Sequence, residues 1–344
     1  MKTPLIISKN VSLQDKHTFG LPWKSRFFCE LQKEEDIAEA VSFAKEKKIT
    51  TLVLGGGSNI LPTKKYTGLV IQNLITGKKI IKETRSHVLL RVAAGENWHK
   101  LVLWTIRKNL FGLENLSLIP GTVGGAVVQN IGAYDVDIQR FITEVVAYSL
   151  VTGKRKVFKH EDCSFDYRNS IFKPSDKWLV TSVTLKLSKT FKPVLTYKPL
   201  QGMQSSSSQL TAKRVSQEVI KIRRSKLPDW NKVGTAGSFF ANPRVSKTKA
   251  KQLQRFYPDI PVFFNYGSKR ATIPAGWLVQ HSSLSQKNRE EFLYHKHALI
   301  VVNYEKGGDV SITKGKRTLA VVERIQTKVH QEFGITLKPE VRIF

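Results

Sequence analysis

Two glycine-rich turns, at residues 55–57 and 121–125, constrain the fold more than any other feature of the sequence. Each follows apolar residues, and the second lies in the almost uncharged stretch SLIPGTVGGAVVQNIGAYDVDI. Glycine allows backbone N–H groups to approach a phosphate closely, and a nest of such groups holds an anion without a charged side chain. Neither turn has the spacing of the GxGxxG fingerprint or of a P-loop. Glycine in a tight turn is usually structural, so each turn alone is weak evidence for a binding site. Two such turns in one chain favour a dinucleotide cofactor without identifying it.

Helical and extended patterns surround the first turn. The stretch DIAEAVSFAKEKKI predicts a helix over residues 36–49 with Asp36 as its N-cap. The spacing places Ile37, Val41, Ala44 and Lys48 on one face of this helix. The stretch TTLVL that follows predicts a buried strand that runs into the glycines. A helix, a strand and a glycine-rich turn in this order indicate a mixed α/β architecture.

The same kind of pattern continues along the chain. A helix is predicted over residues 97–109, with Trp98, Leu101, Val102 and Ile106 inward, and another over 318–333, ended by Gly334. The alternation around a Thr-Gly turn in residues 144–159 predicts a β-hairpin. Further strands are expected in VLLRVAAG, KWLVTSVTLKL and HALIVVN, and a flexible connection in QGMQSSSSQ, residues 201–209.

Length and composition limit the class of protein. A chain of 344 residues suggests two or three domains. No apolar run approaches the ~18 residues of a membrane span, and the N-terminus has too short an apolar core for a signal peptide. Cys29 and Cys163 are isolated, so we expect neither a disulfide framework nor a metal site. These features fit a reducing compartment, and the cytoplasm is the default.

The charge balance is unusual, because 56 basic and 27 acidic residues give a net charge of +29. Such a surface can bind a phosphate backbone through counterion release. The Lys and Arg residues are nevertheless spread along the whole chain, without a basic helix, a zinc finger or a base-stacking motif. A solvated basic surface explains the charge best, with steering of anionic small molecules or incidental contact with nucleic acid as alternatives.

Ten motifs, taken in chain order, connect these segments. They are HTFGL, LVLGGGSNIL, AAGENWHKLV, GLENLSLIPGTVGGAVVQNIGAY, FDYRNSIFK, PVLTYKPL, KLPD, AGSFFANP, IPAGWL and PEVR. Together they span nearly the whole chain and resemble the UDP-N-acetylenolpyruvoylglucosamine reductase family. The order YRxSxF, GSFF and PEVR behind the glycine-rich pair makes the resemblance specific. The PVLTY segment resembles the subclass that carries a tyrosine-bearing substrate loop.

The resemblance implies an α+β, FAD-binding fold of the vanillyl-alcohol-oxidase (PCMH) type with a third, substrate-binding domain. The expected FAD-binding parts are 1–73, to which 337–344 returns, and 74–223, and the substrate-binding domain is 224–336. In the family both glycine-rich stretches hold FAD through backbone groups. The matching positions here are Gly55, Gly56, Gly57, Ser58, Asn59, Ile60, Ile119, Pro120, Gly121, Thr122, Gly124, Gly125 and Ile131, with Arg342 reaching the flavin.

The activity implied is reduction of UDP-N-acetylglucosamine enolpyruvate to UDP-N-acetylmuramate in peptidoglycan precursor synthesis, with NADPH as reductant. FAD would carry the hydride, while the protein positions the substrate, stabilises charge and protonates. A cytoplasmic monomer that needs no metal, no nucleic acid and no membrane is expected.

Three residues match the catalytic positions of the family. Arg168, in FDYRNS, would clamp the substrate carboxylate with its planar guanidinium, although alone it would be interpreted as a surface ion-pair residue. Ser238, in AGSFF, would donate the proton to C2, and its structural alternative is a turn serine that caps the next element. Glu340, in PEVR, would act protonated or by orienting a donor, and its alternative is an exposed pair with Arg342.

Five further positions match substrate contacts. They are Tyr167, Tyr197, Lys226, Asn242 and His297. Tyr167 is equally explained as a core aromatic and His297 as a strand-edge histidine, while Lys226 would neutralise the diphosphate. The chain departs from the family pattern at Ala241, where relatives usually carry Lys, after the WL pair of WLVQH, where an acidic residue is often seen, and in SSLSQKNREEFLYHKH.

Two other functions compete with this interpretation. An FAD-dependent sugar or alcohol oxidase would have the same fold, but the sequence has no His or Cys in a motif for covalent flavin attachment. A basic nucleic-acid-binding protein would lack flavin and bind DNA in a salt-dependent way.

Overall fold

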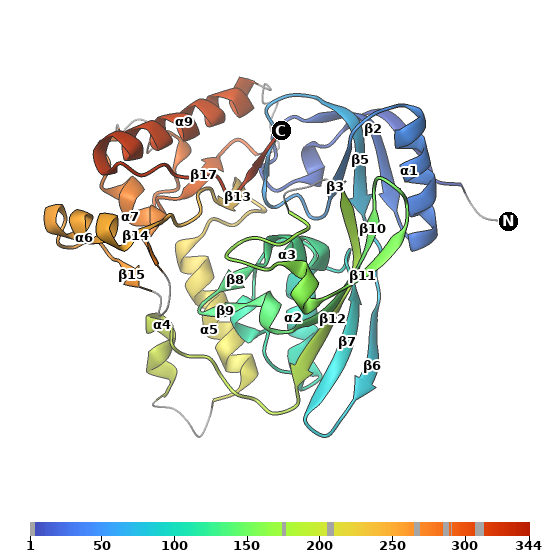
Figure 1. Cartoon of the computed structure of the whole chain (residues 1–344), viewed down its shortest axis with the longest axis horizontal. Helices are drawn as coiled ribbons and strands as arrows, with labels where there is room; N and C mark the ends of the chain where they lie inside the picture. Colours follow the sequence, from blue (N-terminus) through green and yellow to red (C-terminus); the bar gives the residue numbers. More distant parts are fainter. Residues whose placement is uncertain are drawn as a thin grey trace. The chain divides into compact units, whose positions relative to one another are not determined.

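The computed structural model describes residues 4–173, 177–204, 210–264, 269–284, 289, 291–306 and 313–344. The chain divides into two compact units, each assembled from segments that are distant in sequence (Figure 1). Unit 1 comprises Met1–Val11, Lys24–Gly57 and Tyr66–Ser225, and unit 2 comprises Ser12–Trp23, Ser58–Lys65 and Lys226–Phe344. The division into three domains at 73, 223 and 336 stays a prediction.

Unit 1 is built on two sheets. The smaller sheet has the strand order β1-β2-β5-β3, in which β5 runs parallel to β2 and to β3. The larger sheet is antiparallel, with the order β11-β10-β12-β7-β6. The bounds are β1 Ser8–Ser12, β2 Lys24–Leu31, β3 Thr51–Leu54, β5 Tyr66–Asn73, β6 Lys78–Glu83, β7 His87–Ala93, β10 Ile142–Ser149, β11 Arg155–Lys159 and β12 Trp178–Ser188.

Strand patterns in unit 1 follow the sequence closely. The last six residues of the central strand β5 are all buried, as expected for a parallel strand covered on both sides. Strands β10 and β11 form the predicted hairpin, with Val145 paired to Phe158. Gly153 lies in its connection at a φ of +72°, a conformation that glycine adopts without strain. The hairpin and the strands β3, β7 and β12 are therefore confirmed.

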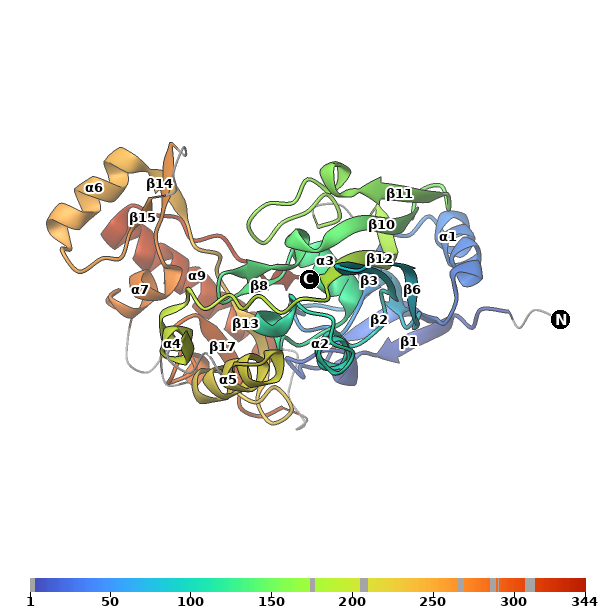
Figure 2. The same cartoon turned by 90° about the horizontal axis from the view of Figure 1, so that it is seen from below.

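The helices of unit 1 cover these sheets (Figure 1). Apolar side chains of α1 pack on the smaller sheet and those of α2 and α3 on the larger one. Figure 2 shows α4 beside α5, where Leu200 packs against Val215 and Val219. The bounds are α1 Ile37–Glu46, α2 Trp98–Arg107, α3 Val123–Gln129, α4 Lys198–Gln201 and α5 Ala212–Lys226. Two short strands, β8 Gly132–Ala133 and β9 Val136–Asp137, form a separate pair.

Two helix predictions can be compared directly with α1 and α2. Asn97 caps α2 by accepting a hydrogen bond from the amide of Lys100, at 2.9 Å, and Trp98 is buried as expected. Asp36 stands at the N-cap position of α1 as predicted, but it also ends the 3₁₀ turn Glu34–Asp36 and its side chain makes no capping hydrogen bond. The prediction that Lys48 shares a helical face with Ile37, Val41 and Ala44 is wrong. The helix has ended by then, and Lys48 is exposed with a φ of +51°.

The described part of unit 2 contains three small sheets and an apolar core. The strand orders are β13-β17, β14-β16-β15 and β18-β4. The bounds are β4 Ile60–Leu61, β13 Gly234–Ser238, β14 Arg244–Ser246, β15 Phe263–Phe264, β16 Arg270–Thr272, β17 Ile300–Asn303 and β18 Arg342–Ile343. The helices are α6 Lys247–Phe256, α7 Ala275–Gln280 and α9 Thr313–Phe333. Short 3₁₀ turns, such as Glu34–Asp36 and Glu114–Leu116, connect other elements.

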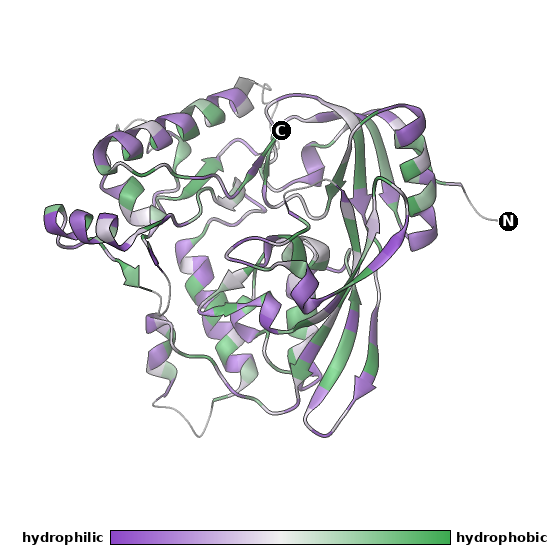
Figure 3. Cartoon of the chain, viewed as in Figure 1, coloured by the Kyte–Doolittle hydropathy of each residue, from purple (hydrophilic) through white to green (hydrophobic). Residues whose placement is uncertain are grey.

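Helix α9 provides much of the core of unit 2. Its residues Val322, Ile325, Val329 and Phe333 are buried, and hydrophobic and hydrophilic stretches alternate along it in Figure 3. The helix begins at Thr313, before the predicted residue 318. The prediction missed this first part because the polar stretch TKGKR lacks the apolar spacing from which a helix is predicted. Gly334, at a φ of +62°, ends the helix as expected, and its amide donates to the carbonyl of His330 at 2.8 Å.

The end of the chain returns to residues near its beginning. Strand β18 pairs in parallel with β4, so that Arg342 lies opposite Ile60. Both strands belong to unit 2. Within the described ranges, no helix combines the length and hydropathy that crossing a bilayer requires. The flexible connection expected at 201–209 lies partly outside the described residues, at 205–209.

Candidate functional site

The two glycine-rich turns pack directly against each other in unit 1. A Cβ atom on Gly55 would lie 2.5 Å from Oγ1 of Thr122, and one on Gly56 would lie 2.8 Å from Cα of Gly121. The carbonyl of Gly121 accepts a hydrogen bond from the amide of Trp98, at 3.1 Å. Side chains at these glycines would force the turns apart. The structure thus brings together the two segments predicted to hold the cofactor.

Gly124 and Gly125 differ in what surrounds them. A Cβ atom on Gly124 would lie 2.9 Å from Cβ of Ala94, and the amide of Gly124 donates to the carbonyl of Ala94 at 2.8 Å. The fold itself therefore requires glycine at 124. A Cβ atom on Gly125 would meet only Oγ1 of Thr122, at 3.6 Å, and Gly125 is exposed. The first turn of α3 therefore leaves room for a group to approach the backbone closely, which fits the uncharged cradle expected for FAD.

Arg168 lies beside the end of the second glycine-rich stretch. Its Nη2 donates to the carbonyl of Gly132 at 2.6 Å, and a Cβ atom on Gly132 would lie 2.8 Å from its Nη1. Arg168 has a φ of +53°, and Nζ of Lys173 donates to its carbonyl at 2.9 Å. Its guanidinium also lies 5.3 Å from the ring centroid of the partly exposed Tyr167. These contacts hold the guanidinium against Gly132, which directly follows the predicted cofactor residue Ile131.

Tyr197 belongs to an anchored segment of unit 1. Its ring meets that of Tyr134 edge to face, with centroids 4.8 Å apart. The neighbouring residues Leu195 and Leu200 are buried against α5. Tyr134 has a φ of +52°, and burial raises the pKa of its phenol. The tyrosine predicted to contact substrate is therefore held by an aromatic neighbour that the sequence analysis did not identify.

Ser238 occupies an irregular position in unit 2. Thr235 pairs with Val302 and Ser238 with Ile300, so β13 contains extra residues between them. This bulge includes Gly237 at a φ of +80°, and bulges of this kind redirect the side chain that follows. Ser238 ends its strand, and the next helix, α6, is capped by Ser246 instead. The interpretation of Ser238 as a helix cap is therefore wrong.

Glu340 lies next to the Ser238 strand in the same unit. Its amide donates to the carbonyl of Phe239 at 2.8 Å. Its own carbonyl accepts a hydrogen bond from Nδ2 of Asn59 at 3.1 Å, and the carbonyl of Asn59 accepts from the amide of Arg342 at 3.0 Å. Backbone bonds in unit 2 thus connect the segments that carry the predicted catalytic residues Ser238 and Glu340 and the predicted cofactor residues Asn59 and Arg342.

The remaining predicted substrate residues of unit 2 have partners within the fold. Oδ1 of Asn242 accepts a hydrogen bond from the amide of Ala275 at 2.9 Å and so caps the start of α7. Nδ1 of His297 accepts from the amide of Leu299 at 3.3 Å. Burial, followed by the charge of Lys226, lowers the pKa of His297, which keeps the imidazole neutral.

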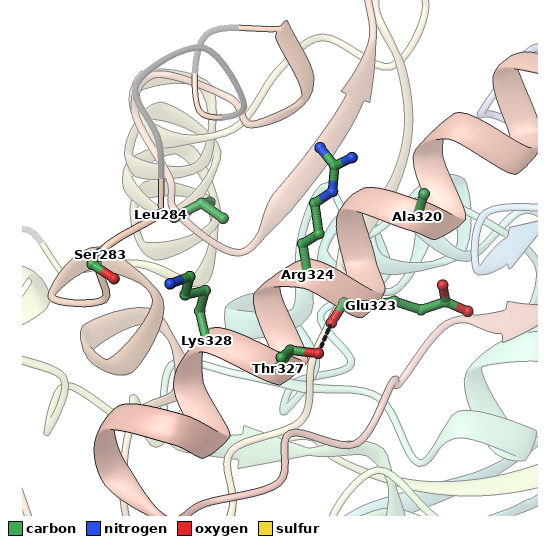
Figure 4. Close-up of a pocket in the computed structure, with 7 residues that line it drawn as sticks. All are labelled: Ser283, Leu284, Ala320, Glu323, Arg324, Thr327 and Lys328. Carbon is green, nitrogen blue, oxygen red and sulfur yellow. Dashed lines mark hydrogen bonds between the residues drawn. The ribbon is translucent and has the colours of Figure 1, made fainter.

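A separate surface groove of unit 2 runs beside α9 (Figure 4). Its described lining consists of Ser283, Leu284, Ala320, Glu323, Arg324, Thr327 and Lys328. Thr327 is tied to its own helix, because Oγ1 donates to the carbonyl of Glu323 at 2.9 Å. None of the predicted site residues is among those that line this groove.

The sequence analysis missed two residues that hold the second glycine-rich stretch from outside it. His99 and Arg223 both bond to the backbone of Leu118. Arg223 lies four residues after Val219 and eight after Val215, on the apolar face of α5. Helical spacing could therefore have identified it as a cation on the inward face of the helix. His99 gives no such signal, because it lies in a motif where only the neighbouring apolar residues show periodicity.

Comparisons with known proteins find matches over nearly the whole chain. Residues 26–159 match the FAD binding domain model, and residues 229–344 match the model described as UDP-N-acetylenolpyruvoylglucosamine reductase, C-terminal domain. The chain is 36% identical to the UDP-N-acetylenolpyruvoylglucosamine reductase of Pseudomonas aeruginosa, with 99% of each chain covered. It is 38% identical to that of Amoebophilus asiaticus, with 98% of this chain and 99% of the relative covered.

Comparison with a solved structure supports the fold alone. The crystal structure of UDP-N-acetylenolpyruvylglucosamine reductase from Thermus caldophilus matches with a TM-score of 0.65 and 22% identity, covering 99% of both chains. The expected α+β, FAD-binding fold of the vanillyl-alcohol-oxidase type is confirmed. With two relatives above 35% identity over nearly their whole length, the chain belongs to the UDP-N-acetylenolpyruvoylglucosamine reductase family.

Proposed function

We propose that this protein reduces UDP-N-acetylglucosamine enolpyruvate to UDP-N-acetylmuramate, with FAD as cofactor and NADPH as reductant. The observation that carries the proposal is family membership over nearly the whole chain, which covers the FAD-binding part and the C-terminal part alike. The alternatives, a sugar or alcohol oxidase and a nucleic-acid-binding protein, are not favoured by any of these relatives. The enzyme is thus an oxidoreductase of peptidoglycan precursor synthesis.

The bound FAD supplies the hydride chemistry, and the residues of the chain hold it and act on the substrate. We assign the FAD contacts to the backbone of the two packed glycine turns and of the segment 58–60, together with Ile131 and Arg342. Gly125 supports this assignment, because among the described residues the one contact given for a Cβ atom there is Oγ1 of Thr122, at 3.6 Å. Uncharged amides can approach a diphosphate more closely than a lysine or arginine side chain allows.

The three proposed catalytic residues have distinct tasks. Hydride addition at C3 of the enolpyruvyl group leaves negative charge at C2 and on the adjacent carboxylate. Arg168, oriented by its bond to Gly132, is suited to bind that carboxylate. Ser238 would donate its hydroxyl proton to C2, and Glu340 on the neighbouring segment would orient or share that proton.

The nucleotide portion of the substrate needs hydrogen-bond donors and a cation. We assign the binding of this nucleotide portion to Tyr197, Lys226, Asn242 and His297. Tyr167 would lie near the carboxylate end of the substrate. Neutral His297 can donate through Nε2 because Nδ1 already accepts from the backbone.

The location and assembly of the protein complete the proposal. UDP-sugars and NADPH are highly charged and do not cross membranes, so we place the enzyme in the cytoplasm. We also propose that it acts as a monomer, which a measurement of molar mass in solution tests.

One experiment tests the proposed function. The purified protein should show the visible spectrum of a flavin, and hot acid should release free FAD. NADPH should bleach the spectrum without oxygen, and the enolpyruvyl substrate should restore it. A protein without flavin absorbance that binds DNA in a salt-dependent way would contradict the proposal, and flavin retained covalently after acid would favour the oxidase.

A further inference from the structure

Leu118, directly before the second glycine-rich turn, has an unusual backbone conformation. Its φ of +56° lies in the left-handed region, a backbone conformation that residues other than glycine, asparagine and aspartate rarely adopt. The peptide group is held on both sides. The amide donates to Nδ1 of His99, and the carbonyl accepts from Nε of Arg223, each at 3.0 Å. A strained leucine is thus fixed by two side chains from two different helices, α2 and α5.

The residue before Leu118 is fixed as well. Ser117 is buried, and its hydroxyl donates to the carbonyl of Glu114 at 2.7 Å. The same hydroxyl lies 2.7 Å from the hydroxyl of Ser216 on α5. Since α5 contributes both Ser216 and Arg223, this helix defines where the stretch 119–125 begins.

Arg223 and His99 are chemically suited to this task. Arg223 is half-buried on the apolar face of α5 and also forms a hydrogen bond with the phenol of Tyr134. Its guanidinium therefore joins Leu118 to the residue that packs on Tyr197. Burial, together with the charges of Arg223 and Arg224, lowers the pKa of His99, so the ring stays neutral and Nδ1 can accept the amide of Leu118.

We propose that Arg223 and His99 are positioning residues that lock Leu118 in its left-handed conformation and thereby aim the backbone of residues 119–125 at the cofactor. Neither residue needs to touch FAD for this role. The inference rests on the proposed function, because it assigns that backbone to the FAD site. It predicts that the FAD affinity lost on substitution of Arg223 depends on which residue occupies position 118.

The test measures FAD affinity by titrating the apoprotein. Arg223→Met should weaken FAD binding by about 10- to 100-fold, because the locked conformation becomes a minor one. Leu118→Gly in the same background should recover about tenfold, since glycine adopts positive φ without the penalty. The matched control is Lys48→Gly. Lys48 is an exposed residue of unit 1 with a φ of +51°, so this change relieves similar strain away from the turn and should recover nothing.

A second variant and a second measurement keep the test decisive. His99→Leu removes the other partner of Leu118 and leaves α5 unchanged. It should cause a smaller loss of FAD affinity, which Leu118→Gly should also repair. Hydrogen exchange in the apoprotein should accelerate at residues 118–125 in both variants. This readout needs no flavin, so it tests the positioning role even if the parent protein binds no FAD and the proposed function fails.

Three results would overturn the inference. Parent-like FAD affinity in Arg223→Met is one, and unchanged exchange at residues 118–125 is another. Equal recovery by Leu118→Gly and Lys48→Gly is the third, because it would mean that Arg223 acts only through global stability.

Discussion

The amide of Glu340 donates a hydrogen bond of 2.8 Å to the carbonyl of Phe239, the residue after Ser238. This bond, together with the bridge between Phe240 and Pro339, ties the end of the chain to the strand that carries the proposed proton donor. The bulge before Ser238 and the C-terminal segment therefore set the direction of the hydroxyl jointly. A role of Ser238 in proton donation and a purely structural role of Ser238 predict different effects of its substitution.

Ser238→Ala should separate the two half-reactions. We expect FAD binding and bleaching by NADPH near the parent rate, and reoxidation by the enolpyruvyl substrate slower by about 10²- to 10⁴-fold, the usual cost of losing a general acid. Stopped-flow absorbance of each half-reaction checks this. Ser246→Ala is the control, because that hydroxyl caps α6 by accepting from the amide of Lys249 and should cost only ~1 kcal/mol of stability. Equal slowing of both steps in Ser238→Ala would instead assign Ser238 to the flavin site.

Gly125→Ala and Gly124→Ala should behave oppositely. A methyl group at 124 meets Ala94, so the apoprotein should lose stability. A methyl group at 125 meets no atom closer than 3.6 Å and replaces glycine in a helix, so the apoprotein should keep or gain up to ~1 kcal/mol while FAD affinity falls. Thermal unfolding of the apoprotein and FAD titration measure the two effects. Full FAD affinity in Gly125→Ala would show that the cofactor does not approach this backbone.

His17 should make the stability of unit 2 depend on pH. Burial is the main cause that lowers its pKa to about 4, with a further contribution from Lys306. Nε2 lies 3.0 Å from the carbonyl of Leu21, and Nδ1 has no hydrogen-bond partner among the described residues. The unfolded state therefore binds the proton first. Stability should be complete above pH 6.5 and decrease by about 3 kcal/mol as the pH falls from 6.5 to 4.

Urea unfolding of His17→Gln across this pH range isolates the effect. The variant should lose less stability between pH 7 and pH 4 than the parent does, whatever its stability at pH 7. His295→Gln, at an exposed position of unit 2, should keep the parent's pH dependence. Parallel curves for the parent and His17→Gln would show that His17 does not carry this dependence.

Local patterns predicted the elements well because burial and capping act over a few residues. The hairpin of β10 and β11, the cap of α2 by Asn97 and the end of α9 at Gly334 all follow from neighbouring residues. The ends of α1 were harder to predict, because Asp36 takes the N-cap position after a 3₁₀ turn without a capping bond and the helix ends before Lys48. Such choices at helix ends differ by little free energy, so sequence spacing alone does not decide them.

Contacts within the site were less predictable because they join distant segments. The motifs named Arg168, but its bond to Gly132 depends on how the turn after α3 folds. The packing of Gly56 on Gly121 likewise requires the two turns to meet. Arg223 shows that a basic residue in a basic chain can be half-buried and bound to the backbone of a distant segment, which composition hides.

Asn242 combines a structural task with its proposed contact to substrate, and two substitutions can separate them. Its Oδ1 accepts from the amide of Ala275 at the start of α7, whereas its Nδ2 can donate to the diphosphate. Asn242→Asp keeps the acceptor, so stability should change by less than ~0.5 kcal/mol. It also places negative charge near an anionic ligand and should raise KM for the UDP-sugar at least about tenfold. Asn242→Ala should instead lose about 1 kcal/mol of stability in addition to affinity. Unfolding by urea and steady-state kinetics measure both quantities, and Asn231→Asp, at an exposed position of unit 2, serves as the charge control. An unchanged KM in Asn242→Asp would leave this residue with its capping role alone.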